Sequence, residues 1–235
     1  MKFVRILAGI LLLPCCVAVS RTVYLLFLAI NNDHGSSMFW LATGAGLGGW
    51  LLVFMFLPAP IKSYILAHEL THAIWGHFMG ASVLGMRVSK NGGNVRLTET
   101  NVFIALAPYF FPLYAFLVMA AYFLASVFWD LEKYFPGLLA AMGFTLGFHM
   151  FFTIMALLRK QPDVEVYGKF FSFTLIYFMN AILICLLLVM VSPVTLFQFF
   201  ERFAADFAWI FRLIANLLIF GCESLLGSFF FGKNN

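Results

Sequence analysis

Two histidines and a glutamate lie within five residues, in the segment His68-Glu69-Leu70-Thr71-His72. Residues four apart on a helix project from one face, so the imidazoles of His68 and His72 can bind one Zn²⁺ ion. Glu69 lies beside them without having to be a ligand. In this HExxH arrangement the carboxylate acts as the general base for a metal-bound water, which then attacks a peptide carbonyl. The pattern therefore predicts a hydrolytic zinc site with Glu69 as its catalytic residue.

The sequence around this segment is typical of a membrane protein. Of the 235 residues, 63% are hydrophobic and only 10% are charged, whereas soluble domains carry about 25% charged residues. The apolar runs are also about as long as the roughly 20 residues that a membrane span needs. Charged and imidazole groups are costly in such helices and usually mark function. The setting therefore favours a metal site over a chance HExxH match.

The charge distribution and the cysteines indicate neither a nucleic-acid-binding surface nor a CxxC site. The net charge is +4, and the lysines and arginines are scattered near the ends of the apolar segments. They form no basic footprint for nucleic acid. The four cysteines include no CxxC pair and are interpreted as small buried apolar residues.

We predict an all-α, multi-pass integral membrane protein with one domain over residues 1–235. The expected spans are residues 4–30, 38–57, 61–79, 102–128, 138–158 and 170–191. The first two spans precede a catalytic core at 58–191, and an amphipathic tail helix follows at 192–235. The first 20 residues also resemble a signal peptide, so cleavage there is an alternative. The tail can lie in the membrane interface or form a seventh span, and the distribution of basic residues does not decide the orientation.

A β-hairpin is predicted between the third and fourth spans. Residues 83–90 and 94–100 alternate in polarity around Asn91-Gly92-Gly93. Asn-Gly between such segments is a strong hairpin signal, because both turn positions need a positive φ. We expect this hairpin at the membrane surface, just after the helix that carries the HExxH segment.

A catalytic zinc site needs a third protein ligand, and the sequence offers two. His149 lies about eleven residues into the span at 138–158, so at 1.5 Å per residue its depth of roughly 16 Å matches that of His72 if the two helices run parallel. Asp163 follows Pro162 beyond the end of that span and reaches the site only if this segment folds back. Depth favours His149, with Asp163 as the alternative.

Together these features resemble the site-2 protease family of intramembrane zinc metalloproteases. The resemblance covers about residues 58–190 and rests on HELTH in a membrane helix, the hairpin after it, and an aspartate in a proline-containing segment downstream. The stretch from Gly147 to Ser172 is similar to a bacterial branch of that group, which implies a bacterial inner membrane. The third ligand of the family is the aspartate of an LDG motif. Asp163 matches it in chain order but is followed by Val164, so His149 stays a candidate.

The resemblance implies a zinc endopeptidase that cleaves membrane-embedded proteins or peptides. A substrate helix must unwind locally, and the edge of the hairpin, with Val95 and Leu97, can hold the unwound segment as an added strand. Asn180, within the span at 170–191, is a second candidate for substrate binding through its amide. The competing hypothesis is a metal-binding membrane protein without proteolytic activity, such as a transporter, a sensor or a scaffold. Neither hypothesis determines an oligomeric state.

Overall fold

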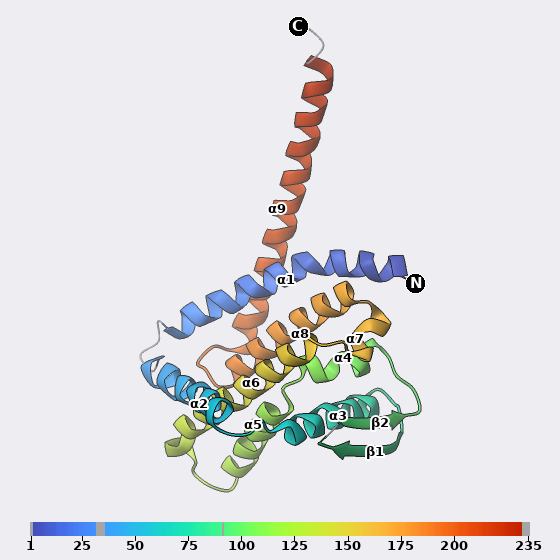
Figure 1. The fold of residues 1–235 in the computed structure, drawn as a ribbon. Helices are drawn as coiled ribbons and strands as arrows, with labels where there is room; N and C mark the ends of the chain where they lie inside the picture. Colours follow the sequence, from blue (N-terminus) through green and yellow to red (C-terminus); the bar gives the residue numbers. More distant parts are fainter. Residues whose placement is uncertain (1, 32–35, 91, 232–235) are drawn as a thin grey trace.

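The computed structural model describes residues 2–31, 36–90 and 92–231 as a helical bundle with one small hairpin (Figure 1). The elements in chain order are α1 (Lys2–Asn31), α2 (Ser36–Phe56), α3 (Ile61–Phe78), β1 (Val83–Ser89), β2 (Gly92–Leu97), α4 (Val102–Phe110), α5 (Leu113–Ser126), a 3₁₀ turn (Glu132–Tyr134), α6 (Phe135–Leu157), α7 (Pro162–Tyr167), α8 (Lys169–Met190) and α9 (Leu196–Phe231). The predicted helical bundle with a hairpin after the HExxH helix is confirmed. Most of the polar turn predicted between the first two spans lies outside the described residues.

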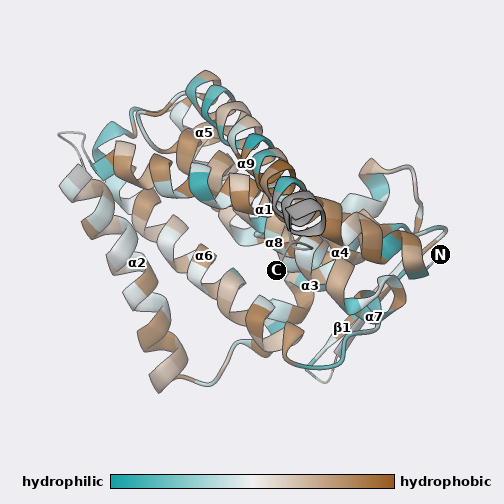
Figure 2. Ribbon diagram, turned by 90° about the horizontal axis from the view of Figure 1, so that it is seen from above, coloured by the Kyte–Doolittle hydropathy of each residue, from teal (hydrophilic) through white to brown (hydrophobic). Residues whose placement is uncertain are grey.

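Within the described ranges, five helices are long and apolar enough to cross a membrane, namely α1, α2, α6, α8 and α9. The pair α4 and α5 adds a sixth candidate, a broken span whose halves meet at 74°. Large apolar side chains are exposed on these helices, for example Leu41, which is 71% exposed, and Phe220, which is 70% exposed. Exposed apolar surfaces of this extent are typical of contact with lipid, and Figure 2 shows hydrophobic residues, in brown, along the helices.

The helix that carries the HExxH segment is not among these candidate spans. We predicted a span at residues 61–79, but the corresponding helix α3 lies below the hydropathy of the spans within the part of the chain that the structure describes. Lys62, Glu69 and three histidines on its 18 residues account for this difference. The count of about six spans is still met, because α9, which we left open as an interfacial helix or a span, is apolar enough to cross.

Glycines allow α2 and α6 to pack closely side by side (Figures 1 and 2). A Cβ added at Gly46 of α2 would lie 1.8 Å from the carbonyl oxygen of Ala140, and one at Gly143 of α6 would lie 2.1 Å from that of Thr43. The helix backbones therefore touch at these two positions, as small residues permit in membrane helices. This contact fixes α6, which leads directly into α7.

We expect Gly46→Ala to destabilise the protein by about 1–3 kcal/mol, because the backbone of Ala140 cannot give way without separating the helices. Gly48→Ala in the same helix is the matched control, since nothing lies within 4 Å of a Cβ there. The control should be neutral or slightly stabilising, given the better helix propensity of alanine. Thermal unfolding in detergent followed by helical circular dichroism measures both. Equal midpoints for the two variants would contradict the close contact.

The N-terminal helix packs against α8, and its arginines tie it to two further elements. Near its start, the guanidinium of Arg5 donates a hydrogen bond to the carbonyl oxygen of Val166 in α7 and lies over the ring of Tyr167. Further along, Arg21 forms an ion pair with the fully buried Asp206 of α9, and the hydroxyl of Thr22 donates to the same carboxylate at 2.9 Å. The polar face of the predicted amphipathic tail helix thus helps to attach α9 to α1.

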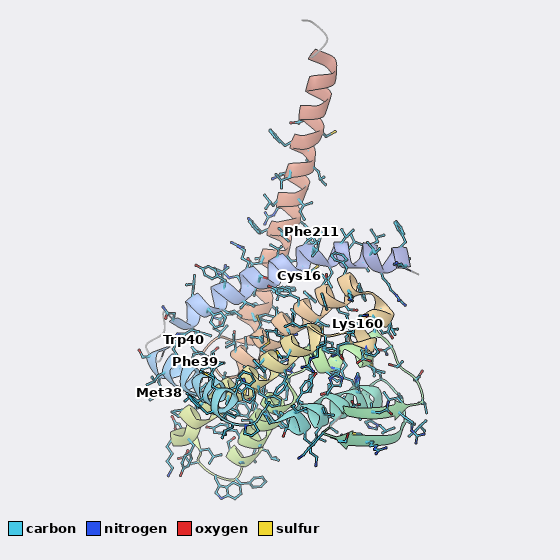
Figure 3. The ribbon with its side chains drawn as sticks, in the orientation of Figure 1. Cys16, Met38, Phe39, Trp40, Lys160 and Phe211 are labelled. Atoms are coloured by element: carbon cyan, nitrogen blue, oxygen red, sulfur yellow. The ribbon has the colours of Figure 1, made fainter. Side chains whose placement is uncertain are left out.

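Beyond this attachment, α9 stands away from the bundle (Figure 1). Phe211 lies on α9 past the point where it crosses α1 (Figure 3) and is 42% exposed. The outer part of α9 therefore plays no role in positioning the residues of the candidate site.

Candidate metal centre

Two helices bring the predicted ligands together. His68 and His72 project from one face of α3, and Asp163 lies in the first turn of α7. Asp163 Oδ2 lies 3.7 Å from His68 Nε2 and 3.6 Å from His72 Nε2. One ligand atom from each of the three residues lies within 4.8 Å of the others. This cluster can hold a metal ion.

The backbone of α4 orients the ring of His72. The Asn101 side chain caps α4 by accepting hydrogen bonds from the backbone N–H groups of Phe103 and Ile104. The carbonyl oxygen of Ile104 then lies 2.8 Å from His72 Nδ1. Because a carbonyl only accepts, Nδ1 carries the proton and Nε2 keeps its lone pair toward Asp163. Histidines that bind metals are usually held in this way.

Asp163 is placed by the turn that leads into α7. Pro162 occupies the first helical position, where its missing N–H costs nothing. The hydroxyl of Tyr109 in α4 lies 3.2 Å from Asp163 Oδ2 and 3.3 Å from Gln161 Oε1. Burial raises the pKa of the Asp163 carboxyl, but the facing imidazoles of His68 and His72 outweigh this and hold that pKa well below its usual range. Asp163 is therefore an ionised carboxylate facing two imidazoles.

The structure brings Asp163, and not His149, to the paired histidines. His149 Nε2 lies 3.1 Å from Asn180 Oδ1, and His149 is not part of the cluster formed by His68, His72 and Asp163. We preferred His149 because we placed α3 and α6 as parallel spans and compared depths, whereas α3 is not one of the candidate spans. The chain instead turns back after α6, so that Pro162 leads Asp163 to the site. The geometry thus favours the alternative ligand.

Glu69 faces the hairpin and is only 8% exposed. The backbone N–H of Val95 lies close enough to this carboxyl to lower its pKa. A Cβ added at Gly93 would lie 2.4 Å from Glu69 Cγ and 2.7 Å from its Oε1, so β2 passes directly over the side chain. Burial raises the pKa of the Glu69 carboxyl, and the neighbouring His68 and His72 lower it in part.

The register of the hairpin differs from our prediction. Gly92 pairs with Ser89, and Gly93 pairs with Val88, so both glycines belong to β2 rather than to the turn. Asn91, which we placed in the turn, lies outside the described residues. Gly93 has no side chain, so β2 can pass close to Glu69 at this position. The strand pairing therefore extends to Gly92 and Gly93.

Two clefts meet at this cluster. The larger, of about 850 Å³, is lined by the consecutive residues 93–100 together with parts of α3 and α7. The second, of about 630 Å³, lies toward α2 and α6. Both reach His68 and Glu69, and both are bordered by Gly93 and Gln161. The candidate centre is therefore accessible from two sides.

The residues that we predicted to bind substrate occupy different positions. Val95 and Leu97 line the larger cleft. Leu97 also packs against α3, since its Cδ1 would lie 2.9 Å from a Cβ at Gly76. Asn180 is 7% exposed and lines neither cleft, and its amide nitrogen donates to the carbonyl oxygens of Tyr109 and Ile176. The structure thus shows Asn180 as a link between helices.

Sequence reasoning did not find Tyr109, Ile104 or Gly93, which orient the ligands or the carboxylate. Each acts through a contact with a residue at least 24 positions away, such as Gly93 with Glu69. No local pattern identifies such contacts. No family model, curated protein or solved structure matches the chain.

Proposed function

We propose that this chain is a zinc-dependent endopeptidase that cleaves membrane-embedded protein substrates, in the manner of the site-2 proteases. The observation that carries the proposal is the convergence of His68, His72 and Asp163 beside the buried carboxylate of Glu69, in a chain rich in apolar helices. Two imidazoles and one carboxylate leave a fourth position open, as in catalytic zinc sites.

The spacing of the donor atoms fits zinc. Ligands about 2.0–2.1 Å from a zinc ion, at tetrahedral to trigonal angles, lie roughly 3.3–3.6 Å from one another. The observed separations of Asp163 Oδ2 from the two Nε2 atoms are 3.7 and 3.6 Å. All three ligand atoms lie within 4.8 Å of one another, so the side chains would have to move inward to complete the site. The proton on His72 Nδ1, held by Ile104, leaves its Nε2 ready to bind.

The residues around the site supply the remaining chemistry. A bound zinc ion would polarise the scissile carbonyl and acidify the attacking water. Glu69 takes the proton from that water and passes it to the departing amine nitrogen. The N–H of Val95 lies beside the Glu69 carboxylate, and Gly93 lets the strand close over it. Asp163 neutralises part of the positive charge and positions the two histidine ligands.

The larger cleft suits an extended peptide. Residues 93–100 line it in an unbroken run, and within the described residues the sheet has only two strands, so β2 has β1 on one edge alone. A substrate helix that enters the site must give up its internal hydrogen bonds, and a strand edge can replace them. We therefore place the unwound substrate segment along β2, with its scissile bond near Glu69.

Metal removal tests the proposal. Purified protein should contain about one zinc ion per chain by elemental analysis and should cut a labelled single-span reporter protein in proteoliposomes. A chelator should abolish cleavage, and added zinc should restore it, because the ion polarises the carbonyl and acidifies the attacking water. Protein that stays metal-free after zinc titration, or that cuts equally well in excess chelator, would refute the assignment.

Gly93→Ala should lower the cleavage rate by about 10- to 100-fold with the zinc content unchanged. The added methyl group collides with Glu69 Cγ, and a displacement of about 1 Å of a catalytic group costs up to 10²-fold in rate. Gly85→Ala on the partner strand is the control, since a Cβ there lies 3.4 Å from its nearest neighbour, the end of the Arg96 side chain. Initial rates on the same reporter compare the two. A Gly93→Ala rate equal to that of the control would contradict the close packing of β2 on Glu69.

A further inference from the structure

His149 is half-buried between the helices and takes part in a chain of hydrogen bonds that the proposed reaction does not use. Both N–H groups of the Asn180 amide are engaged, one with the carbonyl oxygen of Tyr109 at 2.8 Å and the other with that of Ile176 at 2.9 Å. The amide oxygen therefore faces His149 Nε2 at 3.1 Å. Because this oxygen only accepts, Nε2 of His149 carries the proton. In the neutral ring Nδ1 is then an acceptor.

His68 has the opposite requirement. Its Nε2 faces Asp163, and its Nδ1 is buried with no hydrogen-bond partner in the part of the chain that the structure describes. When Nε2 binds a metal, Nδ1 carries a proton, and a buried N–H without an acceptor costs about 1–3 kcal/mol. The other ligand, His72, has such an acceptor in Ile104. His68 needs one as well.

A small cavity lies between these two histidines. Its volume is about 20 Å³, and its lining includes the polar residues His68, His149, Thr71 and Thr145, together with Tyr64 and Tyr114. A cavity of at least about 10–15 Å³ with two to four polar partners holds one water molecule. The hydroxyls of Thr71 and Thr145 donate to carbonyl oxygens of their own helices, at 2.7 and 2.8 Å, which leaves their lone pairs free to accept.

We propose that this cavity is a site for one structural water that bridges Nδ1–H of His68 to Nδ1 of His149, which makes His149 a positioning residue for the metal site rather than a ligand. The water accepts from His68 and donates to His149, while its second proton reaches a threonine hydroxyl. Asn180 holds His149 in the tautomer that this bridge needs. The inference rests on the proposed function only in that His68 must bind a metal through Nε2.

The same asparagine connects to the other side of the site. Asn180 binds the backbone carbonyl of Tyr109, and the hydroxyl of Tyr109 lies 3.2 Å from Asp163 Oδ2. One residue of α8 therefore supports two of the three ligands, His68 through His149 and the water, and Asp163 through Tyr109. These hydrogen bonds offset the free-energy cost of placing the polar pair His149 and Asn180 between apolar helices.

Zinc affinity tests the bridge without any assay of cleavage. Wild-type protein, His149→Phe and His149→Gln are compared by competition with a chromogenic chelator, and Co²⁺ absorption spectra report the ligand set. We expect His149→Phe, which replaces the acceptor Nδ1 by an apolar ring, to weaken zinc binding about 10-fold, within the 10–100-fold typical of residues that hydrogen-bond a ligand. His149→Gln keeps an acceptor and should bind zinc within threefold of wild type. The cobalt spectrum should keep its shape in both.

Controls separate this inference from misfolding and from the proposed function. Thr153→Val removes another buried hydroxyl of α6 that does not line the cavity and should leave zinc affinity within twofold. If His149→Phe does not fold by circular dichroism, His149→Met, which adapts to irregular spaces, takes its place. Wild-type affinity in the folded variant overturns the bridge. Loss of binding as complete as in His68→Ala, with a changed cobalt spectrum, also overturns it by making His149 a ligand. A wild-type protein that binds neither metal refutes the proposed function itself.

Discussion

Glu69→Gln should reduce cleavage by at least about 10²- to 10⁴-fold, the contribution of a general base, while the protein keeps its zinc. Glutamine has nearly the shape of glutamate, so it can occupy the same buried position under Gly93. It cannot take a proton from water. Because Glu69 is not one of the three clustered ligands, the metal stoichiometry should stay near one per chain.

The measurement pairs initial cleavage rates in proteoliposomes with elemental analysis of the same preparations. Glu99→Gln is the matched control, because this exposed glutamate lines the same cleft at its far end. It should cleave at close to the wild-type rate. A Glu69→Gln protein that still cuts its substrate would end the peptidase hypothesis. Zinc-dependent flux or signalling that survives the substitution would instead favour a transporter or sensor.

Asp163→Ala should weaken zinc binding by more than the roughly 10–100-fold seen when a residue that supports a ligand is removed. The substitution takes away one of the three donors and the charge that faces both imidazoles, at 3.7 and 3.6 Å. We also expect Asp163→Asn to bind poorly, since a neutral amide oxygen is a weaker ligand for Zn²⁺ than a carboxylate. Cleavage should fall with the metal content.

Chelator competition on purified protein measures this affinity directly. Glu165→Gln, two positions along the same short helix and exposed, is the control and should not change it. The comparison with His149→Ala decides between the two candidate ligands, because only the true ligand should approach the loss seen for His68→Ala. Full zinc retention by Asp163→Ala would return His149 to the ligand set.

Local patterns in the sequence were sufficient for the parts of this protein that depend on neighbours along the chain. The spacing of His68 and His72 places both rings on one face of α3, since a helix returns to the same face after four residues. Long apolar runs identify α1, α2, α6 and α8 as helices able to cross a membrane. Alternating residues around a glycine pair predict the hairpin.

The tertiary structure alone decided which residue lies beside the paired histidines and what holds it there. Asp163 reaches the histidines because the chain reverses after α6, and Glu69 is buried because Gly93 lets β2 pass over it. Ranking His149 by depth required the direction of α3 relative to α6, which no run of hydrophobic residues encodes. Periodicity reports the face of an element, whereas the contact between two elements is set by packing, by turns and by single small residues far apart in the chain. The sequence therefore determined which chemical groups are present, and the fold determined which of them lie together.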